Sequence, residues 1–230
     1  MPDDSHDSSD LLRRAGTGDQ RALGELFERH RARLRRMVQI RLAHRLKGRI
    51  DPSDVLQDTY LELSRSLGQY LQNPTLPFFL WLRFLTGKKL QAIHRHHLGT
   101  RMRDVHQEVS LHAGALPQAS SESLAAHLLG RLTSPSHAAI RAELRLRVQE
   151  ALNTMSLLDR EVLALRHFEQ LSNTETAQVL GLTESGASNR YIRALGRLKS
   201  ILASVPSADE PSPADSDSGA TRRRDGGMTR

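Results

Sequence analysis

Residues 171–199 read LSNTETAQVLGLTESGASNRYIRALGRLK and decide the fold of the chain. Ser172 and Glu175 have the spacing of a capping box, which predicts a short helix that stops at Gly181. Thr183 then caps a longer helix that reaches about Ala203. A short helix, a tight turn with glycine and a longer helix make a helix-turn-helix, the arrangement with which many proteins enter the DNA major groove.

The longer helix has two contrasting faces. At 100° per residue its apolar stripe contains Ala187, Tyr191, Ala194, Leu195, Leu198 and Leu202. The opposite pole is short and polar at first and cationic later, with Ser185, Asn189 and Arg193 flanked by Ser188, Arg190 and Arg197. This pole predicts contacts to base edges and phosphates. The alternative is an ordinary helical hairpin with a solvated face.

A second predicted helix runs from Asp51 to about Leu67. Asp51 caps it, Pro52 occupies its first turn and Asp54 follows three residues after the cap. Its outer pole consists of Asp54, Gln57, Asp58 and Leu61. An acidic face within a basic stretch of chain repels DNA, so it predicts a protein-docking surface. The alternative is an acidic first turn, favoured by the helix dipole, beside a lone exposed leucine.

The third pattern lies in residues 77–103, PFFLWLRFLTGKKLQAIHRHHLGTRMR. Its first half is apolar and aromatic, which predicts a helix anchored in a core. Its second half is a basic end without an acid: Lys88, Lys89, Arg95, His96, His97, Arg101 and Arg103. This end predicts a nucleic-acid platform. Because the nearby histidines do not share a helix face and no cysteine assists them, we expect no metal site.

The charge pattern supports a polyanionic partner. The 230 residues contain 33 Lys+Arg and 26 Asp+Glu. Residues 11–104 have 19 cations and 8 anions, a balance of +11, whereas residues 1–10 carry −4. The absence of cysteine excludes disulfides and thiol catalysis. No apolar run approaches the roughly 20 residues of a membrane span, so we expect no membrane insertion and a cytoplasmic location.

The predicted fold is all-α, because strand-type alternation is absent and helix-forming residues dominate. We expect two small helical domains at 11–104 and 137–203. A flexible linker at 105–136, with a short helix at 121–131, would let the two domains move independently. Residues 1–10 and 204–230 are predicted to be a disordered acidic leader and a disordered tail.

The order of these patterns resembles the bacterial sigma-70 family, specifically the small extracytoplasmic-function (ECF) sigma factors that keep only regions 2 and 4. Residues 51–67 match the acidic region 2 helix, and residues 78–95 match its segment from the tryptophan to the basic patch. Residues 157–199 match the region 4 helix-turn-helix almost end to end. Residues 101–111, RMRDVHQEVSL, resemble a subgroup common in planctomycetes.

The resemblance implies a promoter-specificity subunit of RNA polymerase that needs no cofactor. Region 2 would dock on the polymerase clamp through Asp54, Gln57, Asp58 and Leu61. It would bind the −10 element through Arg83, Lys88, Lys89, Arg95, His96, Arg101 and Arg103. Region 4 would meet the polymerase flap and read the −35 element through Glu184, Ser185, Ser188, Asn189, Arg190, Arg193 and Arg197. The family also implies an anti-sigma protein as a partner.

Two other functions are open to a chain with a helix-turn-helix. A LuxR-like regulator would need a ligand pocket or a phosphoacceptor aspartate in a βα pattern, and residues 11–104 show neither. A nuclease or recombinase would need clustered carboxylates or a nucleophile in context. Asp54 and Asp58 share one helix face, but the sequence places no third acid near them, so we expect a protein that is not an enzyme.

Overall fold

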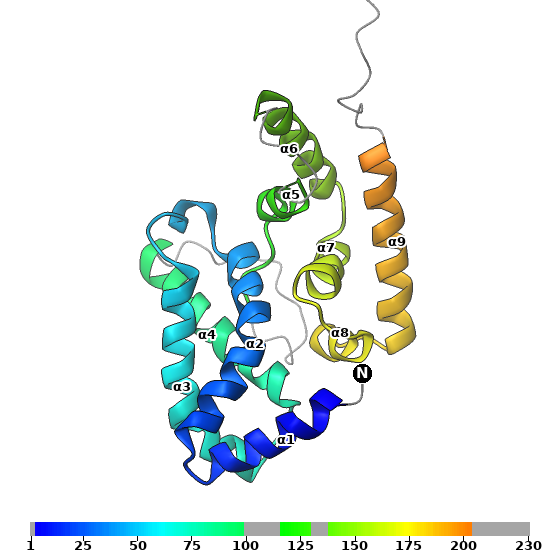
Figure 1. Ribbon diagram of the computed structural model, residues 1–230. Helices are drawn as coiled ribbons and strands as arrows, with labels where there is room; N and C mark the ends of the chain where they lie inside the picture. Colours follow the sequence, from blue (N-terminus) through cyan, green and yellow to red (C-terminus); the bar gives the residue numbers. More distant parts are fainter. Residues whose placement is uncertain (1–2, 99–115, 130–137, 204–230) are drawn as a thin grey trace, which may run out of the picture.

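The computed structural model describes residues 3–98, 116–129 and 138–203. Throughout these residues the regular elements are helices, apart from one isolated bridge between Lys47 and Ile50 (Figure 1). The all-α prediction is therefore confirmed. None of the helices in the described residues is both long and apolar enough to cross a membrane.

The N-terminal domain is a bundle of helices α1 (Asp3–Gly16), α2 (Gln20–Arg41), α3 (Pro52–Gln72) and α4 (Phe78–Leu98), with a 3₁₀ turn, η1 (His44–Leu46). Asp19 and Asp51 cap α2 and α3 by accepting backbone N–H groups, as the sequence predicts for Asp51. Apolar side chains from these helices form its core, which includes Leu26, Leu34, Val38, Leu56, Leu63 and Leu82.

The C-terminal domain contains α6 (Ala138–Asn153), α7 (Leu157–Leu163), the π-helical turn η2 (Ala164–Phe168), α8 (Asn173–Leu180) and α9 (Glu184–Ala203). The capping box of Ser172 and Glu175 is present, and Gly181 ends α8 in the left-handed conformation at φ 64°. The helix-turn-helix therefore has its predicted bounds. Between Ser156 and Glu169 the chain forms α7 followed directly by η2.

The predicted disordered leader is wrong for residues 3–10, because α1 already begins at Asp3. Further along α1, Leu11 and Ala15 are buried in the core of the N-terminal domain. These apolar anchors give the helix the tertiary support that a short isolated helix lacks.

The predicted flexible linker is wrong for its described part. The expected short helix exists as α5 (Ser121–Leu129), but it packs against α6 and α2. The Ser120 N–H donates to the Ile40 carbonyl of α2 at 3.1 Å. Leu116 lies so close to Gly87 of α4 that a Cβ there would collide with it. This part of the linker is thus seated on both domains.

The two domains also pack directly on each other, against the expectation that they move independently. Figure 1 shows α7 and α8 beside α2 and α4, with α9 on the side away from α3. Leu165, Leu171 and Leu180 join the same buried apolar cluster as the N-terminal domain. The shared cluster makes the described chain one closed body, because separating the domains would expose these side chains to water.

Candidate functional site

The start of α9 is fixed by polar contacts to its cap and to α8. Thr183 Oγ1 accepts the N–H of Gly186 at 3.1 Å. Thr174 Oγ1 donates to Glu184 Oε1 at 2.9 Å, and the Asn173 side chain donates to the Glu184 carbonyl at 2.8 Å. Glu184, predicted to touch DNA, is exposed but its carboxylate is occupied. In this structure Glu184 links the start of α9 to the start of α8.

The outward pole of α9 contains most of the residues predicted to read DNA. Ser185, Asn189, Arg193 and Arg197 are all exposed. Ser188 and Arg190 are half-buried, and Arg190 donates to Asp159 of α7 at 3.3 Å. The pole therefore has a short polar half followed by two exposed arginines, the order expected of a helix whose N-terminal part enters a major groove.

Sequence reasoning missed Ile192, which lies beside this pole and is 63% exposed. The sequence could have indicated this residue, because Ile192 is aliphatic and lies outside the apolar stripe of α9. An exposed apolar side chain next to polar groups that are predicted to read bases is suited to contact with a thymine methyl group.

The outer face of α3 is free in the closed body. Asp54, Gln57 and Asp58 are exposed, and Leu61 is 46% exposed. On the opposite side of the helix Val55, Leu56 and Leu63 are buried. In Figure 1 α3 lies on the far side of the molecule from α9, so the C-terminal domain does not cover this face.

The basic end of α4 is only partly available. Lys88, Arg95 and His96 are exposed, and the Lys88 ammonium lies 5.6 Å from the centre of the exposed Phe84 ring. Lys89 is half-buried and forms an ion pair with Glu62 at 2.9 Å. Of the other residues predicted to bind the −10 element, Arg101 and Arg103 lie outside the described residues.

His94 turns inward rather than toward the other histidines. The Ala43 N–H donates to its Nε2 at 3.3 Å, and burial lowers the pKa of its ring. A neutral ring is the form that accepts this hydrogen bond. Among the described residues no three His, Asp or Glu side chains gather as a metal site requires.

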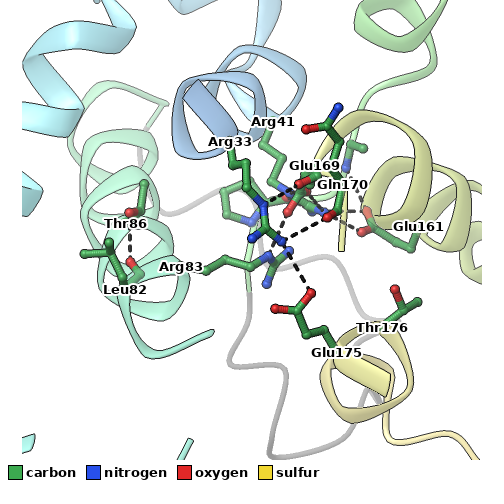
Figure 2. A network of polar contacts seen from close by, with 12 residues as sticks. Arg33, Arg41, Leu82, Arg83, Thr86, Glu161, Glu169, Gln170, Glu175 and Thr176 are labelled. Atoms are coloured by element: carbon green, nitrogen blue, oxygen red, sulfur yellow. Dashed lines mark hydrogen bonds and ion pairs between the residues drawn. The ribbon is translucent and has the colours of Figure 1, made fainter. Parts of the chain in front are cut away.

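Among the described residues that were predicted to bind the −10 element, Arg83 alone is buried. It is 4% exposed, and its Nε donates to Glu169 Oε2 at 2.7 Å (Figure 2). Arg83, which the sequence predicted to bind the −10 element, is therefore not accessible to DNA in this structure. The physical reason is that the face of α4 carrying Arg83 is covered by the C-terminal domain.

Glu169 is the centre of a buried ionic network between the domains. Its Oε1 accepts from Arg41 Nε at 2.8 Å and from Arg41 Nη2 at 2.6 Å. Arg41 Nη2 also donates to Glu161 Oε2 at 2.7 Å. Both arginines come from the N-terminal domain and both glutamates from the C-terminal domain, as Figure 2 shows. We call these four residues the interdomain latch.

The charges of the latch balance, which makes their burial tolerable. Burial by itself would raise the pKa of Glu169, but Arg41 and Arg83 together lower it below its ordinary value. Burial would likewise lower the pKa of Arg41, and Glu161 with Glu169 raises it instead. Glu169 and Arg41 are thus both charged at neutral pH. Removing one partner from such a pair leaves a buried charge uncompensated, which is strongly destabilising.

Two more arginines of α2 extend the network at the edge of the interface. Arg33 Nη2 donates to the Gln170 carbonyl at 3.0 Å and to Glu175 Oε2 at 3.3 Å. Arg36 Nη2 donates to Gln170 Oε1 at 2.7 Å. Gln170 adopts φ 59°, a left-handed conformation that is uncommon for a side chain of its kind. Arginines of α2 thus hold both its carbonyl and its side chain.

Comparison with known proteins places the chain among transcription factors of one family. Residues 145–198 match the model of sigma-70, region 4. The RNA polymerase sigma factor CnrH of Cupriavidus metallidurans is 31% identical over 195 residues, which cover 84% of this chain and 92% of that protein. The ECF RNA polymerase sigma factor SigD of Mycobacterium bovis is 29% identical over 189 residues, covering 82% of this chain and 81% of the relative.

A solved structure agrees with the fold. CnrH in complex with the cytosolic domain of CnrY aligns with a TM-score of 0.51 and 24% identity, covering 86% of this chain and 97% of that one. These relatives give no support to a LuxR-like regulator. The planctomycete subgroup stays a prediction. The relatives span both predicted domains, and the chain therefore belongs to the sigma-70 family of RNA polymerase sigma factors, in its extracytoplasmic-function group.

Proposed function

We propose that this sigma factor directs promoter-specific transcription initiation through three separate surfaces. The outer face of α3 docks on the clamp of core RNA polymerase. The basic end of α4 contacts the −10 element, and the outward pole of α9 reads the −35 element. The observation that carries this division is the α9 pole, where exposed Ser185 and Asn189 precede exposed Arg193 and Arg197.

The chemistry of the three surfaces supports their different partners. The α3 face combines two carboxylates with an exposed leucine, a mixture suited to a protein surface and repelled by a phosphate backbone. The α4 end and the α9 pole present Lys and Arg, which neutralise phosphates. The C-terminal domain would in addition meet the polymerase flap. No step of this role requires a cofactor or a catalytic group on the chain.

Regulation by a second protein is part of the same proposal. CnrH has been solved together with the cytosolic domain of CnrY. By analogy, an anti-sigma protein would bind this chain and keep it from polymerase. The factor would act in the cytoplasm, on the nucleoid when it is bound to polymerase.

The docking surface is tested with Asp58→Arg combined with Gln57→Ala. Because both side chains are exposed, the double variant should fold normally and bind core polymerase more weakly in a pull-down with purified components. Glu28→Arg is the control, since Glu28 is an exposed carboxylate of the same domain on another helix. Wild-type binding by the double variant would remove α3 from the proposed docking surface.

A further inference from the structure

We propose that Arg45 and Arg49, in the turn around η1, bind the phosphate backbone of duplex DNA together with the basic end of α4. The inference rests on the proposed function, because it adds a second element to the surface with which the N-terminal domain contacts DNA. It goes beyond that function by naming two further DNA-binding residues and the part of DNA that they bind. The η1–α4 patch is defined as Arg45, Arg49, Arg95, His96 and His97.

A direct contact brings the two elements of the patch together. The Ala43 N–H, directly before η1, donates to His94 Nε2 of α4 at 3.3 Å. At about 100° per residue, Arg95 and His97 lie on either side of His94 around α4, and both are exposed. Figure 1 shows η1 and the end of α4 at the same end of the N-terminal domain, away from α1. Two segments that are 51 positions apart therefore present their cations at one end of the bundle.

The turn after η1 is held by its own hydrogen bonds. The Arg49 and Ile50 N–H groups both donate to the Leu46 carbonyl at 3.0 Å. Gly48 adopts φ 93°, a conformation that glycine reaches without steric cost. The Leu46 side chain is buried, whereas Arg45 and Arg49 are exposed. Because the backbone at both arginines is already ordered, binding a phosphate costs less conformational entropy than it would on a disordered segment.

The charge around the patch attracts an anion. Residues 41–50 contain four Lys or Arg and no acid, and residues 78–98 also contain four and no acid. The nearby acids already have partners. Glu122 of α5 pairs with His44 and with Arg145, each at 2.8 Å, and Asp51 accepts the Ser53 N–H at 2.7 Å as the cap of α3. The patch thus offers a concentration of positive charge to an anionic partner.

The chemistry of the patch favours a phosphate backbone over a protein surface or a base edge. Protein interfaces are anchored by large apolar side chains, which the described chain exposes outside this patch, at Leu61, Phe84, Leu146, Leu157 and Ile192. Guanidinium groups bind phosphate through two parallel hydrogen bonds. Contacts to phosphates position a protein on the duplex without reading its sequence. Arg45 and Arg49 should therefore strengthen binding to every DNA sequence equally.

The test measures the affinity of the full chain for a non-specific duplex at several salt concentrations. Arg45→Ala combined with Arg49→Ala should make the slope of log affinity against log salt shallower by about 1.8, or about 0.9 for each lost phosphate contact. Because both side chains are exposed, the double variant should keep the wild-type circular dichroism spectrum. Arg45→Lys combined with Arg49→Lys keeps both charges and should keep most of the slope.

A matched control removes two arginines at the other end of the same domain. Arg13→Ala combined with Arg21→Ala replaces exposed residues and makes the same change in net charge. Arg21 lies at the start of α2, whose 22 residues separate it from η1 by about 33 Å. The control should keep the wild-type slope. Equal slopes in the two alanine variants, whether both are shallower or both are unchanged, would overturn the proposal.

Transcription in vitro distinguishes this proposal from the proposed function. With core polymerase, Arg45→Ala combined with Arg49→Ala should use the same start sites as the wild type and lose yield at lower salt. A changed set of start sites would overturn the assignment to phosphates. Weaker binding to core polymerase with unchanged DNA binding would make the patch a protein surface and overturn it as well. Absence of defined start sites with the wild type would instead contradict the proposed function, and the slopes on the non-specific duplex would still decide the role of the patch.

Discussion

Replacing Glu169 with glutamine should destabilise the closed chain more than any substitution of an exposed carboxylate. The change keeps the size of the side chain and removes its charge. Glu169 is 1% exposed and accepts three hydrogen bonds of 2.6–2.8 Å from Arg41 and Arg83. In Glu169→Gln, Arg83 loses its ion pair while buried, and Arg41 keeps only Glu161.

The magnitude follows from the cost of an unpaired buried charge. Breaking a buried pair by removing one partner costs about 3–5 kcal/mol. For a chain of this size, each kcal/mol lowers the melting temperature by about 2–4 °C. We therefore expect a fall of about 6–20 °C. The loss concerns the contact between domains, so each domain should keep its helices at low temperature.

The assay is thermal unfolding followed by circular dichroism and by the fluorescence of Trp81, which stacks on Tyr70 with ring centres 4.2 Å apart in the N-terminal domain. The control is Glu143→Gln, which replaces an exposed carboxylate that pairs with Arg147 on its own helix. Its free energy of unfolding should lie within about 0.5 kcal/mol of the wild-type value, as for most surface substitutions. A double-mutant cycle with Arg83→Met should give a coupling energy of about 0.5–3 kcal/mol. The reasoning fails if Glu169→Gln has the same melting temperature as the control variant, or if the double-mutant cycle shows no coupling energy.

Three further predictions concern DNA reading, pH and the turn of the helix-turn-helix. Asn189→Ala should weaken DNA binding by about 1–3 kcal/mol for the preferred base at one position of the −35 element. Arg197→Ala should weaken binding to all sequences evenly and flatten the salt dependence of binding. Equal losses for the two variants in a base-substitution series would refute this division. Because the pKa of Glu169 lies below its ordinary value of 4.5 when folded, its stabilising effect is complete above that value and is lost as the pH falls through the lower, folded-state pKa. The melting temperature should therefore fall only in that acidic range, and a loss of stability near pH 7 would point to another group. Gly181→Ala places a Cβ at φ 64° and should destabilise the C-terminal domain by about 1–2 kcal/mol in denaturant unfolding, and an unchanged midpoint would contradict the strain.

The features that the sequence predicted correctly depend on residues close together in the chain. Asp51 caps α3 through a residue two positions away, and the Ser172–Glu175 box closes within one turn. Helical periodicity likewise predicted the exposed poles of α3 and α9. Each of these outcomes is decided by local geometry, which a short window of sequence contains.

The closed arrangement of the domains was not predictable in this way. Arg83 and Glu169 are 86 positions apart, and Arg41 and Glu169 are 128 apart. Periodicity identifies a face of a helix but not which distant element covers it. An arginine at the edge of a basic stretch was therefore interpreted as a DNA contact, although Glu169 neutralises it within the fold. The helical leader was missed for a related reason, since α1 depends on burial of Leu11 and Ala15.

The central claim, that this sigma factor confers promoter specificity through α9, is tested most directly by sequencing the 5′ ends of transcripts made in vitro. Core polymerase is mixed with genomic DNA and with the wild-type chain, with an Asn189→Ala variant, or with no added factor. The wild type should produce a set of defined start sites that share an upstream sequence about 35 base pairs away, and Asn189→Ala should relax one position of that shared sequence. Start sites identical to those of core polymerase alone would contradict the claim.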